Sequence, residues 1–86
     1  MSNSYSDKDK FFLDYISLRK TFDVLAKDIK NNHMTMWGIT QAMERLLNKG
    51  LSKGLIHTPF FNNHTYEITI LRDEMFDKLN EITLRG

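Results

Sequence analysis

The stretch of sequence that decides the fold runs from Asp23 to Leu71, DVLAKDIKNNHMTMWGITQAMERLLNKGLSKGLIHTPFFNNHTYEITIL. It begins with a short amphipathic block, residues 23–29, and continues after a polar break into a second helical segment, residues 35–49. Two segments rich in β-branched and aromatic residues then lie on either side of Asn62-Asn63. Helix, turn, helix and hairpin in this order predict a small α+β fold, in which helices precede a β-hairpin and a last helix follows it.

The size and composition of the chain allow one domain. A chain of 86 residues buries only about 60–65% of its unfolded surface, so a single small core is expected. We expect residues 1–6 to form a flexible N-terminus ahead of one domain, residues 7–86. The sequence contains no Cys, no apolar run long enough for a membrane span and no signal-peptide pattern, which predicts a cytoplasmic protein without contact to a membrane.

The first helical region begins at Ser6, where a capping hydroxyl precedes Asp7 and Asp9. An apolar stripe with alternating spacings of four and three follows: Phe11, Tyr15, Leu18, Phe22, Leu25 and Ile29. Either one long helix over residues 7–30 or two helices fit this stripe, and we favour two, broken near Lys20-Thr21 with Thr21 as a cap. The stripe is most simply core, and its alternative role is the seam of an oligomer.

The second helical segment is expected to begin at Thr35, after a turn at residues 31–33, and to end at Gly50 or Gly54. Its spacing predicts two faces. The inward face holds Met36, Ile39, Met43, Leu46 and Leu47. The outward face holds Trp37, Thr40, Gln41, Glu44, Arg45 and Asn48.

The predicted hairpin consists of residues 55–61 and 64–71 around the two-residue turn Asn62-Asn63. Pro59 cannot donate a hydrogen bond within a ladder, so we place it at a free edge. From Arg72 onward, Met75, Phe76, Leu79 and Ile82 have helical spacing and predict a last helix.

Four segments of the chain resemble the winged helix-turn-helix superfamily of the MarR and GntR type, over residues 21–80. Residues 24–29 resemble the first helix of its motif and residues 39–46 its recognition helix. Residues 48–51 resemble the exit from that helix, and residues 66–70 resemble the return strand of its wing. The resemblance implies that the chain binds duplex DNA as a regulatory protein and does so as a homodimer.

If the helix at residues 35–49 enters a major groove, Thr40, Gln41 and Arg45 are placed to contact bases. Lys49 and Lys53 are then placed to contact phosphates. The full predicted DNA-binding set is Trp37, Thr40, Gln41, Arg45, Lys49, Lys53, Asn62, Asn63 and His64. The charge distribution is consistent with binding to DNA, because residues 31–65 carry three basic residues, Arg45, Lys49 and Lys53, against one acidic residue, Glu44. The net charge of the whole chain is only +1.

The alternative function is a protein-binding accessory or inhibitor module of the plasmid or phage type. Its surface would comprise Trp37, Phe60, Phe61 and the methionines Met34, Met36 and Met43. The three histidines lack further ligands at a suitable spacing, so we expect no metal and no cofactor. No nucleophile–base set, carboxylate pair or Gly-rich phosphate loop is recognisable, so we expect no enzyme.

Overall fold

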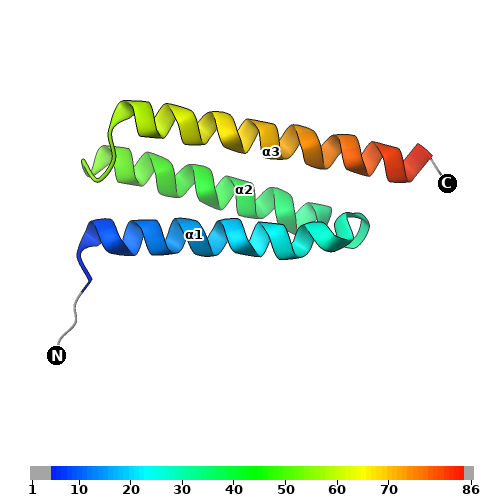
Figure 1. Cartoon of the computed structure of the whole chain (residues 1–86), viewed down its shortest axis with the longest axis horizontal. Coiled ribbons are helices and arrows are strands. Elements are labelled where there is room, and N and C mark those ends of the chain that lie inside the picture. Colours follow the sequence, from blue (N-terminus) through cyan, green and yellow to red (C-terminus); the bar gives the residue numbers. More distant parts are fainter. Residues whose placement is uncertain (1–4, 85–86) are drawn as a thin grey trace.

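The structure is a computed structural model, and it describes residues 5–84 of the chain. It contains three α-helices, α1 (Asp7–Leu25), α2 (Ile29–Ser52) and α3 (Thr58–Leu84), with a 3₁₀ turn, η1 (Ala26–Asp28), between α1 and α2. Each helix runs antiparallel to the one before it, and α1 and α3 flank α2 on its two sides (Figure 1). The residues described form no strand, so the predicted α+β winged fold is wrong and the architecture is all-α.

Helix α1 begins at Asp7, as the sequence predicts, and continues past the expected break to Leu25. The Ser6 hydroxyl accepts from the Asp9 amide at 3.1 Å, and the Asp9 carboxylate accepts in turn from the Ser6 amide, which forms a capping box. The expected break at Lys20-Thr21 is wrong, because the Thr21 hydroxyl donates to the Ser17 carbonyl within a continuous helix. A threonine that bonds back to the preceding turn does not cap a new helix.

The chain turns at η1, and α2 begins six residues before the expected Thr35. Asp28 caps α2 by accepting from the Asn31 amide at 3.4 Å. The predicted turn at residues 31–33 is helical instead, and the Asn32 side chain donates across the junction to the Leu25 carbonyl at 3.2 Å. Asn32 therefore satisfies a carbonyl left free at the end of α1.

Helix α2 ends as the glycine spacing predicts. Gly54 has φ +72°, and its amide donates to the Leu51 carbonyl at 3.1 Å. The Leu55 amide donates to the Gly50 carbonyl at 2.8 Å, which completes a Schellman motif. The left-handed conformation at Gly54 carries no steric penalty because glycine lacks a Cβ.

The segment predicted as a hairpin, residues 55–71, instead forms the loop and the first half of α3. Pro59 lies in the first turn of α3, where a missing amide proton costs no helical hydrogen bond. Asn62-Asn63 is part of the helix and not a turn. Ile68, Leu71 and Met75 follow at spacings of three and four and are buried, so burial of a helical stripe outweighs the strand propensity of residues 65–70.

The core lies between the three helices. The predicted inward face of α2 is confirmed for Met36, Met43 and Leu47, and Ile39 and Leu46 pack at its margin. The apolar stripe of α1 is also core, which leaves it unavailable as an oligomer seam. The buried apolar residues are Phe11, Tyr15, Phe22, Met36, Met43, Leu47, Ile56, Ile68, Leu71 and Met75.

Candidate functional site

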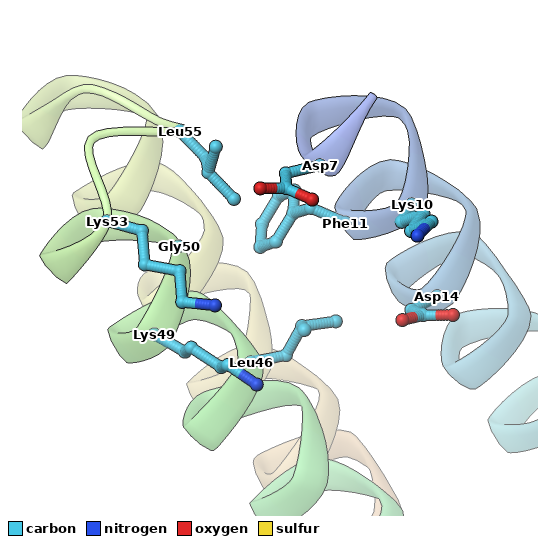
Figure 2. Close-up of a pocket in the computed structure, with 9 residues that line it drawn as sticks. All are labelled: Asp7, Lys10, Phe11, Asp14, Leu46, Lys49, Gly50, Lys53 and Leu55. Carbon is cyan, nitrogen blue, oxygen red and sulfur yellow. The ribbon is translucent and has the colours of Figure 1, made fainter. Parts of the chain in front are cut away.

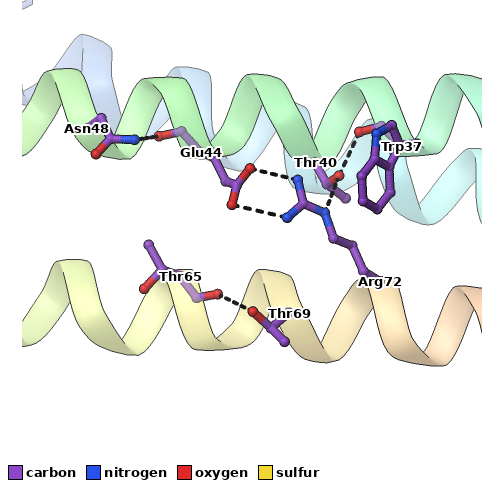
Figure 3. A network of polar contacts seen from close by, with 7 residues as sticks. All are labelled: Trp37, Thr40, Glu44, Asn48, Thr65, Thr69 and Arg72. Carbon is purple, nitrogen blue, oxygen red and sulfur yellow. Dashed lines mark hydrogen bonds and ion pairs between the residues drawn. The ribbon is translucent and has the colours of Figure 1, made fainter.

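Two of the residues predicted to contact DNA lie in the interface between α2 and α3 (Figure 3). Thr40 is fully buried, and its hydroxyl donates to the Trp37 carbonyl at 2.6 Å and accepts from Arg72 Nε at 2.9 Å. The Arg72 guanidinium also lies 4.3 Å from the centre of the Trp37 ring. Thr40 is therefore not accessible to DNA, whereas Trp37 packs against Arg72 at the edge of this interface and stays 37% exposed.

The same guanidinium binds Glu44 of α2. Arg72 Nη1 and Nη2 donate to the two carboxylate oxygens of Glu44 at 3.0 and 2.7 Å. These hydrogen bonds hold the pKa of Glu44 below its usual value. The pair fixes α3 against α2, because an arginine fork and a carboxylate have matching planar geometry.

The residues of the predicted hairpin tip lie on α3. Asn62 and Asn63 are exposed, whereas His64 is half-buried and its ring stacks on Phe60 at 3.9 Å between centroids. His64 Nδ1 lies 2.9 Å from the Phe60 carbonyl, and its ring makes an edge contact with Tyr15 of α1. His64 thus belongs to the contact between α1 and α3.

The alternative binding surface does not form one patch either. Phe60 and Phe61 are half-buried and pack against the core. Met36 and Met43 are core residues, and among the three methionines named for that surface only Met34 is exposed.

The remaining predicted residues share the outward side of α2. Gln41, Arg45 and Lys49 are exposed and follow one another at intervals of four, which places them along one face of the helix. Lys53 follows at the end of α2. We call Gln41, Arg45, Lys49 and Lys53 the α2 ridge.

A groove runs between the α2 ridge and α1 (Figure 2). Two hollows of about 190 and 400 Å³ form it, and they share Asp14, Leu46 and Lys49. The α1/α2 groove is lined by Asp7, Lys10, Phe11, Asp14, Ser17, Leu18, Ala42, Arg45, Leu46, Lys49, Gly50, Lys53 and Leu55.

The two walls of the α1/α2 groove differ in charge. Lys49 and Lys53 extend from one side, and the α1 wall on the other side carries the two carboxylates of Asp7 and Asp14 together with the ammonium group of Lys10 (Figure 2). Leu46 and Leu55, which are half-buried, supply apolar surface between the walls. A charged rim around an apolar floor resembles a binding site in composition, because apolar contact supplies affinity and the charges fix orientation.

The charge of the whole molecule is also separated by helix. The only acidic residue of α2 is Glu44, whose carboxylate is engaged by Arg72. Helix α3 carries five acidic residues against two basic ones, namely Glu67, Asp73, Glu74, Asp77 and Glu81 against Arg72 and Lys78. The α2 ridge is therefore a basic surface on a molecule with nearly zero net charge, and α3 is acidic.

Arg45, Lys49 and Lys53 were predicted from the sequence as DNA contacts, whereas the residues of the α1 wall were not predicted as site residues. Asp7, Lys10 and Asp14 are spaced by three and four, so they share one face of α1 beside the buried stripe. That spacing is the signal that could have identified them. Which helix they face depends on the path of the chain.

Within residues 5–84 no three His, Cys, Asp or Glu side chains gather as metal ligands do. No helix among these residues is both long enough and apolar enough to cross a membrane. Comparisons with protein-family models, with curated proteins and with solved structures found no match to this chain.

Proposed function

We propose that the chain is a non-enzymatic, cytoplasmic protein-binding module of the accessory or inhibitor type, which takes a segment of a partner protein into the α1/α2 groove. One observation carries this proposal: an apolar floor lies between a basic wall on α2 and a wall on α1 that contains two carboxylates. An amphipathic peptide segment can match all three components, with apolar side chains inside and charges of both signs along its edges.

The same arrangement suits a peptide better than a polyanion. A DNA backbone presents only negative charge, so the carboxylates of Asp7 and Asp14 oppose its approach, and they offset two of the four basic residues in the lining. Duplex DNA also gains little from the apolar surface of Leu46 and Leu55, whereas a peptide side chain buries that surface from water. The segment we expect carries acidic residues toward Lys49 and Lys53.

Selection from a library of random peptides displayed on phage tests the proposal. The expected peptides combine apolar residues at helical spacing with acidic residues on one side. Their binding should fall by about tenfold or more with the double variant Lys49→Glu/Lys53→Glu, because like charges then face each other. The double variant Lys8→Glu/Lys78→Glu is the matched control, because it reverses two charges outside the groove, and it should leave binding unchanged. Failure to enrich any peptide, or peptides that bind both variants equally, would overturn the proposal.

A second candidate function is binding of duplex DNA by the α2 ridge, whose residues Arg45, Lys49 and Lys53 also line the groove. Its support is the exposed line of Gln41, Arg45 and Lys49, on a helix whose single carboxylate is engaged by Arg72. Glutamine and arginine are suited to base contacts and lysine to phosphate contacts.

A further inference from the structure

Helix α1 and the residue before its cap carry a second stripe, distinct from the one in the core. Leu13, Ile16 and Val24 are 50%, 48% and 62% exposed, and Tyr5 is 61% exposed. Asp9 and Lys20 are exposed as well and complete the line. We call Tyr5, Asp9, Leu13, Ile16, Lys20 and Val24 the outer stripe of α1. The spacing of four, three, four and four keeps the five residues from Asp9 to Val24 on one side of the helix. Tyr5 precedes the helix and lies on the same side, because it lines one hollow together with Asp9, Leu13 and Ile16.

The outer stripe is symmetric in its order along the chain. Leu13 and Ile16 lie at equal intervals on either side of the midpoint between Asp14 and Tyr15. Asp9 and Lys20 form the next pair outward, and Tyr5 and Val24 form the last. Each apolar residue therefore mirrors an apolar residue, and the acid mirrors the base. A stripe with this order is complementary to itself when it is reversed.

We infer that the outer stripe of α1 binds a second copy of this chain, with the two α1 helices antiparallel about a two-fold axis. Leu13 then meets Ile16 of the second copy, and Tyr5 meets Val24. Asp9 meets Lys20 at both ends of the contact. A two-fold interface uses the same surface on both subunits, and the symmetric order satisfies this condition.

The charges determine the orientation of the pair. In a parallel arrangement in register, Asp9 would face Asp9 and Lys20 would face Lys20, and like charges opposite each other disfavour association. Shallow hollows line the stripe on both sides of Ile16, one with Tyr5 and Phe12 and one with Lys20 and Val24. Side chains of a second helix can enter hollows of this kind, as knobs enter holes in a coiled coil.

The contact is small. Two helices paired over six residues each bury on the order of 1,000 Å² in total, which is the lower limit for a specific interface. We therefore expect a dimer that dissociates in the micromolar range. The outer stripe and the lining of the α1/α2 groove have no residue in common, so this inference does not depend on the proposed function.

Sedimentation equilibrium of the full chain over a range of concentrations tests the inference. The natural chain should show a monomer–dimer equilibrium, and Ile16→Asp should abolish it, because a carboxylate would be buried against Leu13 of the second copy. Ile70→Asp is the matched control, since Ile70 is also a partly exposed isoleucine but lies on α3. A chain that is monomeric at every concentration, or a dimer that survives Ile16→Asp, would overturn the inference.

Charge reversal tests the antiparallel orientation. Asp9→Lys and Lys20→Asp should each weaken the dimer by about tenfold or more, and the double variant should recover most of the loss. Asp9→Lys also removes the capping box with Ser6, but the double variant lacks it too, so recovery reports on the contact between copies. Losses that merely add in the double variant would contradict the antiparallel pairing.

Discussion

Gly50 of α2 lies directly against the ring of Phe11 in α1. A Cβ placed on Gly50 would come within 2.7 Å of Phe11 Cε1, closer than van der Waals contact permits. The Phe11 ring cannot easily move away, because it is buried and packs against Phe12 and Tyr15. The absence of a side chain at Gly50 therefore sets how closely α1 and α2 approach each other at this end of the molecule.

Gly50→Ala should destabilise the protein. Overpacking against Phe11 outweighs the higher helix propensity of alanine, and we expect a net loss of about 1–2 kcal/mol in the free energy of unfolding. Gly38→Ala is the matched control in the same helix, because nothing lies within 4 Å of a Cβ there. It should stabilise the protein by about 0.5–1 kcal/mol. Urea denaturation measures both, and equal effects of the two substitutions would contradict the close contact.

The Arg72–Glu44 pair should contribute to stability at neutral pH and less in acid. Arg72 lowers the pKa of Glu44 in the folded state, so its contribution is fully present above the unfolded pKa of about 4.3 and is lost as the pH falls through the lower folded value. The Glu44 side chain is partly exposed, so we expect no more than about 1 kcal/mol. Urea denaturation between neutral pH and about pH 3 should show a shallower acid loss for Glu44→Gln than for the natural chain.

Asp73→Asn is the control for that comparison, because it removes an exposed carboxylate next to Arg72 in the sequence. Its acid loss should match that of the natural chain. If the stability of Glu44→Gln falls in acid as steeply as that of the natural chain, the Arg72–Glu44 pair makes no pH-dependent contribution to stability.

Tyr15→Phe should stabilise the protein near neutral pH. Tyr15 is 7% exposed, and its hydroxyl oxygen has no hydrogen-bond partner among the residues described. Removal of a buried, unsatisfied hydroxyl should raise the free energy of unfolding by about 1 kcal/mol. Tyr66→Phe, at an exposed position of α3, is the control and should have little effect. A clear loss of stability in Tyr15→Phe would show that the hydroxyl has a partner.

Because of Tyr15, the free energy of unfolding should also decrease at alkaline pH. Burial raises the pKa of Tyr15 to about 12. The unfolded chain releases this proton near pH 10, so stability is unaffected below pH 10 and declines as the pH rises from about 10 to 12. Tyr15→Phe should reduce this decline by about 2 kcal/mol at its upper end, as measured by urea denaturation. An identical alkaline decline in both proteins would refute the assignment to Tyr15.

If the second candidate function is correct, the protein should bind random duplex DNA at low salt and lose affinity steeply as salt increases. Arg45→Ala with Lys49→Ala should reduce the slope of log affinity against log salt by about 2, because each contact with a phosphate contributes about 1. Lys8→Ala with Lys78→Ala removes the same charge outside the α2 ridge and should leave the slope nearly unchanged. Absence of binding at low salt would eliminate this candidate.

Local sequence signals predicted several features of the helices correctly. The Ser6 cap, the buried stripe of α1, the inward face of α2 and the exit near Gly54 all depend on residues within a few positions of each other. The outward position of Arg45 was predicted for the same reason, and Arg45, Lys49 and Lys53 are all exposed along one helix and its end. Such features need no distant partner to form.

Residues 55–71 show where local signals fail. Thr65, Thr69 and Ile70 favour strands and Asn62-Asn63 favours a turn, yet His64, Ile68, Leu71 and Met75 also have helical spacing. Intrinsic preferences differ by less than about 1 kcal/mol per residue, whereas burial of one large apolar side chain contributes about 1.5–3 kcal/mol. The packing surface of α2 and α1 therefore decides in favour of the helix. The burial of Thr40 has the same cause, because Arg72, thirty-two residues further along the chain, packs over Thr40 and donates a hydrogen bond to its hydroxyl.

The sequence by itself determined where α1 begins and where α2 ends, which residues of α1 and α2 face inward, and that basic side chains gather along one helix. Only the tertiary structure decided that residues 58–71 are helical, that Thr40 is buried against Arg72, and that a wall of α1 faces the α2 ridge. The physical reason is the distance along the chain between the residues that interact. Caps and stripes are set by neighbours along the chain, whereas a groove or a buried arginine requires two segments that only folding brings together.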